Sequence, residues 1–321
     1  MHNGDEQPIM LFDVKRYAIN DGPGIRTTLF MKGCPLRCVW CHNPESWEVE
    51  PEVLFKQSKC IGCNTCGLYP EKLPHTPHYH QESKDAPADE RSSRRKDLWR
   101  GAQVCPARAL ELCGREWTMD ELMAEVEKER DVMQDSGGGV TLCGGEPLMK
   151  PQAALAILQE LGRRGLHRTV DTSLYASAET VTAIARETDL FLVDLKHMDS
   201  ERHRQLTGVG NERILANVKL LTELGANIWF RMPLIEGINA DEENIEATAS
   251  FIASLCSPHD PQGRSPKIHL LPYHDIGKDK HRRRGTVYNP DGITMGEPSE
   301  ATLDRCRRQF EQYGISVVIG G

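Results

Sequence analysis

The sequence predicts an α/β fold in which helices cover a mainly parallel sheet. Three observations support this prediction. From Arg26 onward, short β-like segments alternate with helical ones; most connecting segments have the 3.6-residue apolar period of a helix; and distinctive polar residues follow several strands. Repeated βα units form a full barrel, a partial barrel or a doubly wound sheet. At 321 residues, the chain can form one large domain, or one domain with a small insert.

The strand candidates are short apolar or β-branched runs that lie beside turn residues. They cover residues 26–31, 140–142, 169–171, 190–194, 228–232, 268–271 and 316–319. Among the helices between them, one begins after Thr118, where Glu121 completes a capping box, and runs to about Gln134. The other helical segments cover about 152–164, 178–186, 212–224, 241–255 and 299–313.

Polar residues stand at the carboxyl ends of these strands, the face where parallel barrels carry their chemistry. One such residue would mean little, but a series on the same side predicts a functional site. The series comprises Gly144-Gly145-Glu146, Asp171-Thr172, Asp194 to Lys196, Arg231 and Tyr273-His274.

Composition excludes several classes of protein. Hydrophobic residues make up 39% of the chain, and no apolar run is long enough to cross a bilayer, so no membrane partner is expected. The first residues lack the basic and apolar regions of a signal peptide, which predicts a cytoplasmic protein. Eleven cysteines in such a protein indicate reduced thiols or metal ligands. The net charge of −8 argues against nucleic acid as a partner.

Three cysteines, Cys34, Cys38 and Cys41, lie in one short loop with the spacing C-x3-C-x2-C. A cubane [4Fe–4S] cluster has four irons, so three protein ligands leave one iron open to an outside molecule. A structural zinc site usually draws four ligands from C-x2-C pairs, which this spacing does not supply. The loop therefore favours a cluster with one open iron.

The sequence around this loop resembles a known family. Residues 21–27 (DGPGIRT), the cysteine loop and His42-Asn43-Pro44 resemble the N-terminal signature of glycyl-radical-enzyme activases. These are radical S-adenosylmethionine (SAM) enzymes of the pyruvate formate-lyase-activating type. The resemblance continues at 136–147 (SGGGVTLCGGEP), 194–196 and 271–274. It implies a partial (β/α)6 barrel of the radical SAM type formed by residues 1–50 and 114–321, with a small ferredoxin-like insert at 51–113.

The strand-end residues match SAM-binding positions of this family. Gly144, Gly145 and Glu146 correspond to the positions that hold the SAM amino group, since glycines let the backbone approach a ligand and a carboxylate binds an ammonium group. Cys143 stands where the family usually has Ser, and we interpret it as a small buried residue. Trp40 matches an aromatic position that packs against adenine; otherwise it is a core residue.

The resemblance also implies a monovalent cation beside the SAM carboxylate, held by Asp171, Thr172 and Asp194. The pyruvate formate-lyase-activating member with this site has Met where the present chain has Leu192. The alternative interpretation is that the two aspartates only cap strand ends.

Further positions match the lining of the SAM and substrate cavity. Lys196 and His274 correspond to basic residues near SAM, and Arg231 to one near the substrate peptide; the alternative for each is a surface cation. A four-residue segment resembles the part of the family that contacts the partner's glycine loop, although alone it would form a tight turn. It consists of Asp21, Gly22, Pro23 and Gly24.

The insert carries a second cysteine group. Bacterial two-cluster ferredoxins repeat C-x2-C-x2-C-x3-C-P twice, and each fourth cysteine serves the other cluster. Here Pro70 replaces the fourth cysteine of the first repeat, and only Cys105-Pro106 remains of the second. One complete ligand set is left, which predicts one auxiliary [4Fe–4S] cluster on Cys60, Cys63, Cys66 and Cys105. Zinc on these four residues is the competing interpretation. We interpret the other cysteines as structural: Cys113, Cys143, Cys256 and Cys306.

Together these features predict a glycyl radical enzyme activase. SAM would bind the open iron, and one electron would cleave it to methionine and a 5′-deoxyadenosyl radical, which abstracts hydrogen from a glycine of a partner glycyl radical enzyme. A flavodoxin or ferredoxin would supply the electron. One alternative is a radical SAM enzyme that modifies a small molecule. Another is an iron–sulfur electron-transfer module, which has no need of the 144–146 motif.

Overall fold

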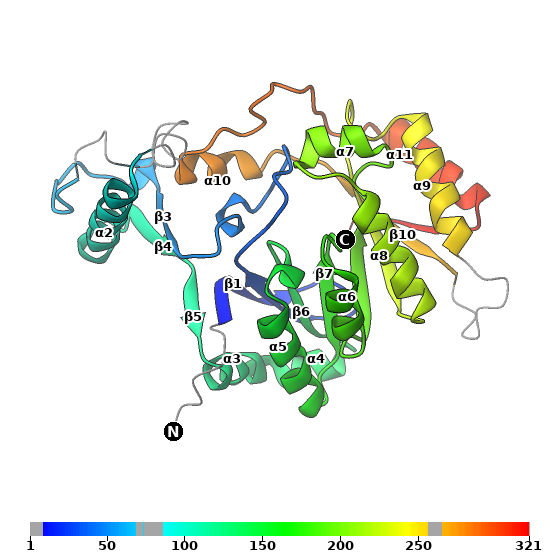
Figure 1. Ribbon diagram of the computed structural model, residues 1–321, viewed down its shortest axis with the longest axis horizontal. Helices are drawn as coiled ribbons and strands as arrows, with labels where there is room; N and C mark the ends of the chain where they lie inside the picture. The colour runs from blue at the N-terminus through cyan, green and yellow to red at the C-terminus, as the bar shows by residue number, and fades with distance from the viewer. Residues whose placement is uncertain (1–8, 69–72, 74–85, 256–264, 321) are drawn as a thin grey trace.

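The computed structural model describes residues 9–68, 73, 86–255 and 265–320 of the chain. Within these ranges nine strands form one open sheet (Figure 1). From one edge to the other they are β11 (Ser316–Ile319), β10 (Lys267–Pro272), β9 (Ile228–Leu234), β8 (Leu190–Asp194), β7 (Arg168–Thr172), β6 (Gly139–Gly144), β2 (Arg26–Met31), β1 (Ile9–Ala18) and β5 (Arg115–Trp117).

Strand direction identifies the architecture. Every neighbouring pair from β2 to β11 runs parallel, whereas β1 and β5 add an antiparallel edge. The strands alternate between an apolar outer face and a polar inner face. In β6, for example, Leu142 joins the main core while Cys143 lines a cavity. A parallel sheet with an open edge and a polar interior is a partial barrel, as predicted, rather than a doubly wound sheet with helices on both faces.

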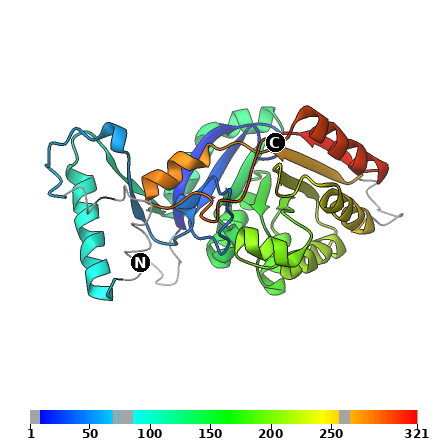
Figure 2. The ribbon, with the colours of Figure 1, turned by 90° about the horizontal axis from the view of Figure 1, so that it is seen from above.

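Helices between the parallel strands cover the outer face of the sheet (Figures 1 and 2). Their buried residues, such as Ile157, Val181 and Phe310, share one apolar cluster with the outward-facing strand residues. These helices are α3 (Met119–Val126), α4 (Arg130–Asp135), α5 (Pro151–Arg163), α6 (Ala178–Ala185), α8 (Glu212–Glu223), α9 (Glu242–Leu255) and α11 (Glu300–Gln312). Two others, α7 (Ser200–Thr207) and α10 (Gly277–Arg284), pack instead against the segment around residues 37–46.

Most predicted elements are present, with one correction. The capping box of α3 is confirmed, since the Thr118 side chain accepts from the Glu121 amide and the Glu121 side chain accepts from the Thr118 amide. The predicted single helix to Gln134 is wrong, because a 3-10 turn, η4 (Glu127–Glu129), separates α3 from α4. At this turn Glu127 binds both Arg130 and Arg164.

The segment between 51 and 113 has its own small sheet and apolar cluster. β3 (Glu52–Phe55) pairs antiparallel with β4 (Leu110–Cys113), and α2 (Ala88–Val104) packs on them. Seen from above, α2 stands at one end of the molecule with α10 between it and the barrel (Figure 2). No helix in the described parts of the chain is both long and apolar enough to span a membrane.

Candidate active site

A cavity of about 620 Å³ opens at the carboxyl ends of the parallel strands. All three cysteines of the 34–41 loop line it, together with residues from five successive strand ends. Most of the predicted site residues therefore meet in one place. Those that line the cavity are Cys34, Cys38, Trp40, Cys41, Gly144, Gly145, Asp171, Thr172, Asp194, Lys196, Arg231 and His274.

The three thiols are free and close enough to influence one another. Burial raises the pKa of Cys38 to about 12, against the lowering effect of Lys196. Burial also raises the pKa of Cys34, and the charge of Cys38 adds to this rise. Among the described residues no three His, Cys, Asp or Glu side chains converge on a single metal ion. Cysteines that bind different irons of one cluster need no such convergence, so the loop fits a [4Fe–4S] cluster.

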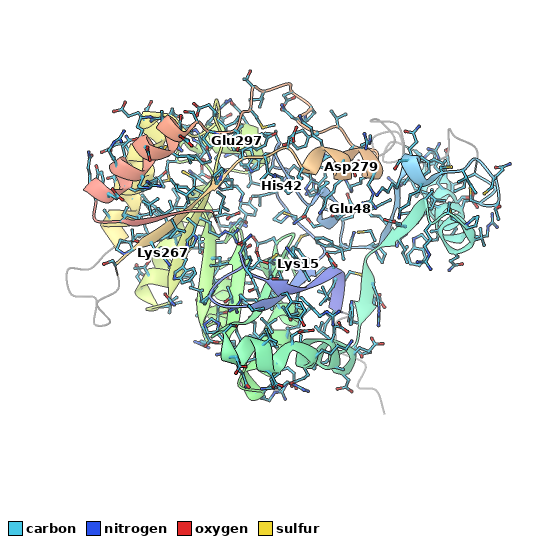
Figure 3. The ribbon with its side chains drawn as sticks, turned by 180° about the vertical axis from the view of Figure 1, so that it is seen from behind. Lys15, His42, Glu48, Lys267, Asp279 and Glu297 are labelled. Atoms are coloured by element: carbon cyan, nitrogen blue, oxygen red, sulfur yellow. The ribbon has the colours of Figure 1, made fainter. Side chains whose placement is uncertain are left out.

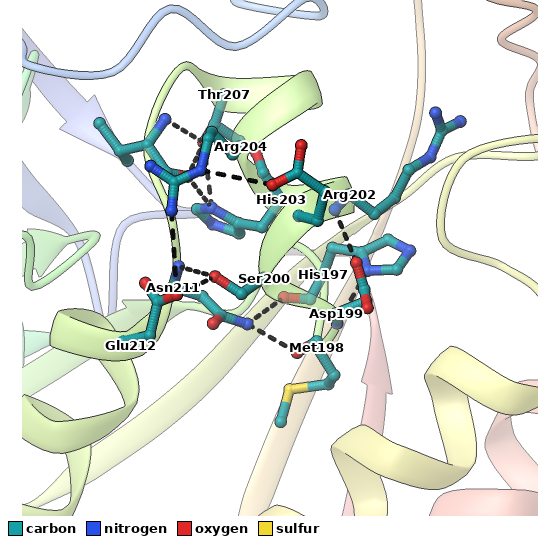
Figure 4. A network of polar contacts seen from close by, with 12 residues as sticks. His197, Met198, Asp199, Ser200, Arg202, His203, Arg204, Thr207, Asn211 and Glu212 are labelled. Atoms are coloured by element: carbon teal, nitrogen blue, oxygen red, sulfur yellow. Dashed lines mark hydrogen bonds and ion pairs between the residues drawn. The ribbon is translucent and has the colours of Figure 1, made fainter.

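The short helix α7 supports the cysteine loop through backbone hydrogen bonds. The amides of Arg37 and Val39 donate to the carbonyls of Thr207 and Leu206, at 2.7 and 3.0 Å. A polar network holds α7 in place (Figure 4). In it His203 Nδ1 donates to the Val209 carbonyl at 2.6 Å, and Thr207 Oγ1 lies 3.1 Å from the same nitrogen.

Helix α10 covers the other side of the loop. His281 Nε2 donates to the Cys41 carbonyl at 3.2 Å. A Cβ atom at Gly277 would lie 2.7 Å from the same carbonyl oxygen, so only glycine fits there. The cysteine loop is thus held between two helices, of which neither was predicted.

The two glycines of the 144–146 motif let β6 approach this loop. A Cβ atom at Gly144 would lie 2.5 Å from the Met31 nitrogen, and one at Gly145 would lie 2.2 Å from the Gly33 oxygen. The Glu146 amide donates to the Gly33 carbonyl at 2.8 Å. The motif therefore fixes the carboxyl end of β6 against the start of the cysteine loop.

The Glu146 side chain, predicted to contact the SAM amino group, lies behind the residues that line the cavity. Only 1% of the residue is exposed. Its carboxylate accepts hydrogen bonds from Thr172 Oγ1 at 2.6 Å, from Ser173 Oγ at 2.5 Å and from the Ser173 amide at 2.8 Å. The Leu148 amide also donates to it, at 3.1 Å. Through these four donors the carboxylate joins β6 to β7.

Opposite charges pair along the inner wall of the cavity. Arg231 Nη1 lies 2.9 Å from Asp171 Oδ2, and Lys196 Nζ lies 2.6 Å from Asp194 Oδ2. Burial raises the pKa of Asp171 to about 7, although Arg231 opposes this rise. The two carboxylates of the predicted cation site are thus already paired with basic side chains, and the Thr172 hydroxyl donates to Glu146.

The predicted substrate segment, 21–24, packs at the amino ends of β2 and β6, and none of its four residues lines the cavity. Thr28 Oγ1 donates to Asp21 Oδ2 at 2.6 Å, and Arg26 Nη1 donates to the Pro23 carbonyl at 3.0 Å. Gly24 has a φ of +66°, and a Cβ atom there would lie 2.4 Å from the Gly138 nitrogen. Gly22 also has a positive φ, +122°. The neighbouring Asn20 does line the cavity, so the segment is one residue away from its lining.

Trp40 has two environments. It lines the cavity and also packs in an apolar cluster with Leu206, Ile235 and Tyr273. Sequence reasoning missed several other lining residues. Ser173 could have been found, because it directly follows Asp171-Thr172, whereas Glu297 and Gly320 carry no sequence signal. Figure 3 shows Glu297 and His42, both cavity residues, at the same end of the molecule.

The second cysteine group lies in the insert. Cys60 and Cys63 are exposed, and Cys66 and Cys105 are half-buried against the insert's apolar cluster. A hydrogen bond from Thr65 Oγ1 lowers the pKa of Cys63. Cys256, which we interpreted as structural, lies outside the described residues. Cys143 is buried but also lines the cavity.

Comparison with known proteins supports the family that the sequence predicts. The Radical SAM superfamily model matches residues 103–252, and a 4Fe-4S single cluster domain matches residues 20–72. The trans-4-hydroxy-L-proline dehydratase activating enzyme of Clostridioides difficile is 38% identical over 97% of this chain and 99% of its own length. The choline trimethylamine-lyase activating enzyme of Oleidesulfovibrio alaskensis is 36% identical, over 98% of each chain.

A third relative is the pyruvate formate-lyase 2-activating enzyme of Escherichia coli, which is 33% identical over 97% of this chain and 92% of its own length. These alignments cover nearly the whole of the chain. The chain belongs to the radical SAM family of glycyl-radical-enzyme activating enzymes.

Proposed function

We propose that this protein uses the described cavity to generate a radical from SAM and to install it on a glycine of a partner glycyl radical enzyme. The observation that supports this most strongly is the convergence of the three loop cysteines with the ends of five parallel strands around one space. A [4Fe–4S] cluster on Cys34, Cys38 and Cys41 supplies the electron and the open iron for cleaving SAM to methionine and a 5′-deoxyadenosyl radical.

We assign SAM to the part of the cavity nearest the cysteine loop. There the backbone of Gly144 and Gly145 is accessible to a ligand, and Trp40 offers an apolar surface for adenine. Lys196 and His274 would lie beside the carboxylate and the ribose of SAM. The half-buried carboxylates of Asp171 and Asp194 would balance the positive charge of the amino and sulfonium groups.

A monovalent cation at Asp171, Thr172 and Asp194 would have to compete with two side chains already present. Arg231 and Lys196 each take one carboxylate oxygen. If such a cation binds, SAM cleavage should depend on the concentration of potassium or sodium, and the absence of any dependence would exclude it.

The partner's glycine loop would enter beside Asp21, Gly22, Pro23 and Gly24 and extend toward Arg231. Support comes from the position of this segment, whose neighbour Asn20 lines the cavity. The relatives' names point to dehydratases, a lyase and pyruvate formate-lyase 2 as enzymes that such proteins activate. A partner from one of these classes is therefore proposed for the present chain.

The insert, residues 51–113, would form a separate unit that carries one auxiliary [4Fe–4S] cluster on Cys60, Cys63, Cys66 and Cys105, with 1–50 and 114–321 forming the barrel. Its own sheet and apolar cluster support this division. We propose a flavodoxin or ferredoxin as the reductant. A cytoplasmic location is proposed because ten cysteines in the described residues are free thiols, which persist in a reducing compartment.

The test is to mix the anaerobically reconstituted protein with SAM, a reductant and candidate glycyl radical enzymes, and to record electron paramagnetic resonance (EPR) spectra. A glycyl radical doublet on one partner, with 5′-deoxyadenosine as product, is the expected result. Cleavage of SAM with consumption of a small molecule and no doublet would instead favour small-molecule modification. A reduced protein that never forms 5′-deoxyadenosine would be an electron-transfer module.

A further inference from the structure

Among the buried polar atoms that have no hydrogen-bond partner within the described residues, two belong to neighbouring strands of the barrel. They are Nε of Arg231, in β9, and Nε2 of His269, in β10. Unpaired buried polar atoms are rare in folded proteins, and each calls for an explanation. A substrate that binds at these strands would supply the partners.

The two atoms belong to neighbouring side chains. Arg231 and His269 are register partners in the parallel pair of β9 and β10, so their side chains point to the same face of the sheet. Arg231 lines the cavity, as does Leu271, two residues after His269 on the same face of β10. His269 does not line the cavity itself, but it lies among three residues that do: Arg231, Leu271 and Gly320, whose carbonyl it contacts through Nδ1. Its unpaired atom therefore lies directly behind this part of the cavity lining.

The tautomer of His269 follows from its hydrogen bond with Gly320. Nδ1 lies 3.1 Å from the Gly320 carbonyl oxygen, which can only accept, so Nδ1 carries the proton. Burial, assisted by the charges of Lys267 and Arg231, lowers the pKa of His269. The neutral ring then exposes an acceptor lone pair at Nε2, whereas Arg231 Nε carries a hydrogen and is a donor.

Packing fixes the orientation of this pair. The Trp229 ring stacks on His269, with centroids 5.3 Å apart and an interplanar angle of 15°. Arg231 is held by its ion pair with Asp171. An acceptor and a donor are thus presented side by side on a rigid wall.

We propose that Arg231 and His269 form a receptor for the main chain of the substrate segment, an inference that rests on the function proposed above. The N–H and C=O of one residue in an extended chain point to the same side, and they match an adjacent acceptor and donor. An anion would be repelled by the lone pair at Nε2, and a cation would be repelled by Arg231. A backbone without a bulky side chain approaches most closely, which suits a glycine-containing loop.

The test measures glycyl radical formation against the concentration of a partner that the unaltered protein activates. His269→Leu removes the acceptor and leaves a buried substrate N–H unpaired. This should raise KM for the partner by about tenfold, and by more than it lowers kcat. In His269→Gln the side-chain amide oxygen can reach the position of Nε2, so most of the loss should be recovered. Ser316→Ala, at an exposed position of the neighbouring strand β11, is the control and should keep the KM of the unaltered protein.

Two results would overturn the proposal even if the protein activates its partner: an unchanged KM in His269→Leu, or a loss in His269→Gln as large as in His269→Leu. Failure of the unaltered protein to activate any partner would instead count against the proposed function. The receptor can be examined separately by 15N NMR of the imidazole. We expect the proton on Nδ1 and a shift of the Nε2 resonance on addition of N-acetyl-triglycine methylamide. A proton on Nε2, or no shift in that resonance, would refute the receptor.

Discussion

The hydroxyl of Thr172 donates a 2.6 Å hydrogen bond to the carboxylate of Glu146, and this bond joins the carboxyl ends of β7 and β6. Ser173 adds two further bonds to the same carboxylate. Glu146 follows the two glycines that pack against the cysteine loop, and Thr172 and Ser173 line the cavity. Glu146 does not line the cavity, but it therefore sets the positions of the two strand ends, of β6 and β7, that do.

This arrangement predicts that Glu146→Ala is strongly destabilising. The change leaves the Thr172 hydroxyl and the Ser173 amide buried without an acceptor, and each unsatisfied group costs about 1–3 kcal/mol. We expect the free energy of unfolding, measured by urea denaturation, to fall by at least the cost of one such group. Ser173→Ala, which removes one donor and leaves the carboxylate with three, is the control and should cost less. Equal losses in the two variants would contradict the central role of Glu146.

The two cysteine groups predict different effects of single substitutions. Cys38→Ala should abolish formation of 5′-deoxyadenosine, because the loop then offers two thiolates for a cluster that needs three. Cys105→Ala should lower the iron content from about eight to about four per chain while the SAM cluster stays in place. Iron analysis and product assay of the reconstituted proteins check both expectations. Iron near four in the unaltered protein would exclude the auxiliary cluster, and zinc in its place would support the competing interpretation.

The barrel strands were predictable because they are apolar on the outer face and short. Strand β1 was missed, since most of its residues are exposed or half-exposed and it has no clear alternation. Helix α10 was missed for a related reason: its sequence, GKDKHRRR, has no apolar face. Ion pairs hold it instead, such as those of Lys280 with Glu45 and Arg284 with Glu52, and their partners are more than two hundred residues away in the sequence.

The site was predictable to the extent that strand ends must meet at one edge of a parallel sheet. Which carboxylate faces the cavity was not predictable. Glu146 and Asp171 both follow strands, but Glu146 is surrounded by four donors from the chain itself, whereas Asp171 meets Arg231 from a strand two places away. Such pairing depends on side-chain positions in three dimensions, which residue types and spacing do not contain.

A buried charge network between the barrel and the insert gives another prediction. Glu52 in β3 binds Arg284 at 2.9 Å and Lys32 at 3.3 Å, and both basic side chains are almost fully buried. Removing one partner of a buried ion pair costs about 3–5 kcal/mol, because the opposite charge remains unpaired. Glu52→Leu should therefore lower the free energy of unfolding by about this amount.

Glu48 is the matched control for Glu52. It also pairs with Arg284, at 3.4 Å, but its side chain is 39% exposed. Glu48→Leu should cost less than about 1 kcal/mol, as is usual for exposed pairs. Urea denaturation of both variants provides the comparison. A small loss in Glu52→Leu would show that the insert does not depend on this network for its attachment to the barrel.

The α7 network predicts how stability depends on pH. Burial lowers the pKa of His203, and the charges of Lys196 and His197 add to this effect, against Glu212. The unfolded state, with a pKa of about 6.5, then binds a proton more readily than the folded state. The contribution of His203 to stability is present above about pH 6.5 and is lost as the pH falls toward the lowered pKa of the folded state.

We therefore expect the free energy of unfolding to fall between about pH 7 and pH 5, and to fall less steeply in His203→Asn. The asparagine amide can still donate to the Val209 carbonyl, the role of Nδ1 in the folded protein, but it does not titrate. Other buried histidines have pKa values lowered in the same direction, so the informative quantity is the difference in slope between the two proteins. Urea denaturation at several pH values measures it. Equal slopes would mean that His203 binds protons alike in the folded and unfolded states, and that its burial beneath the cysteine loop has no energetic consequence.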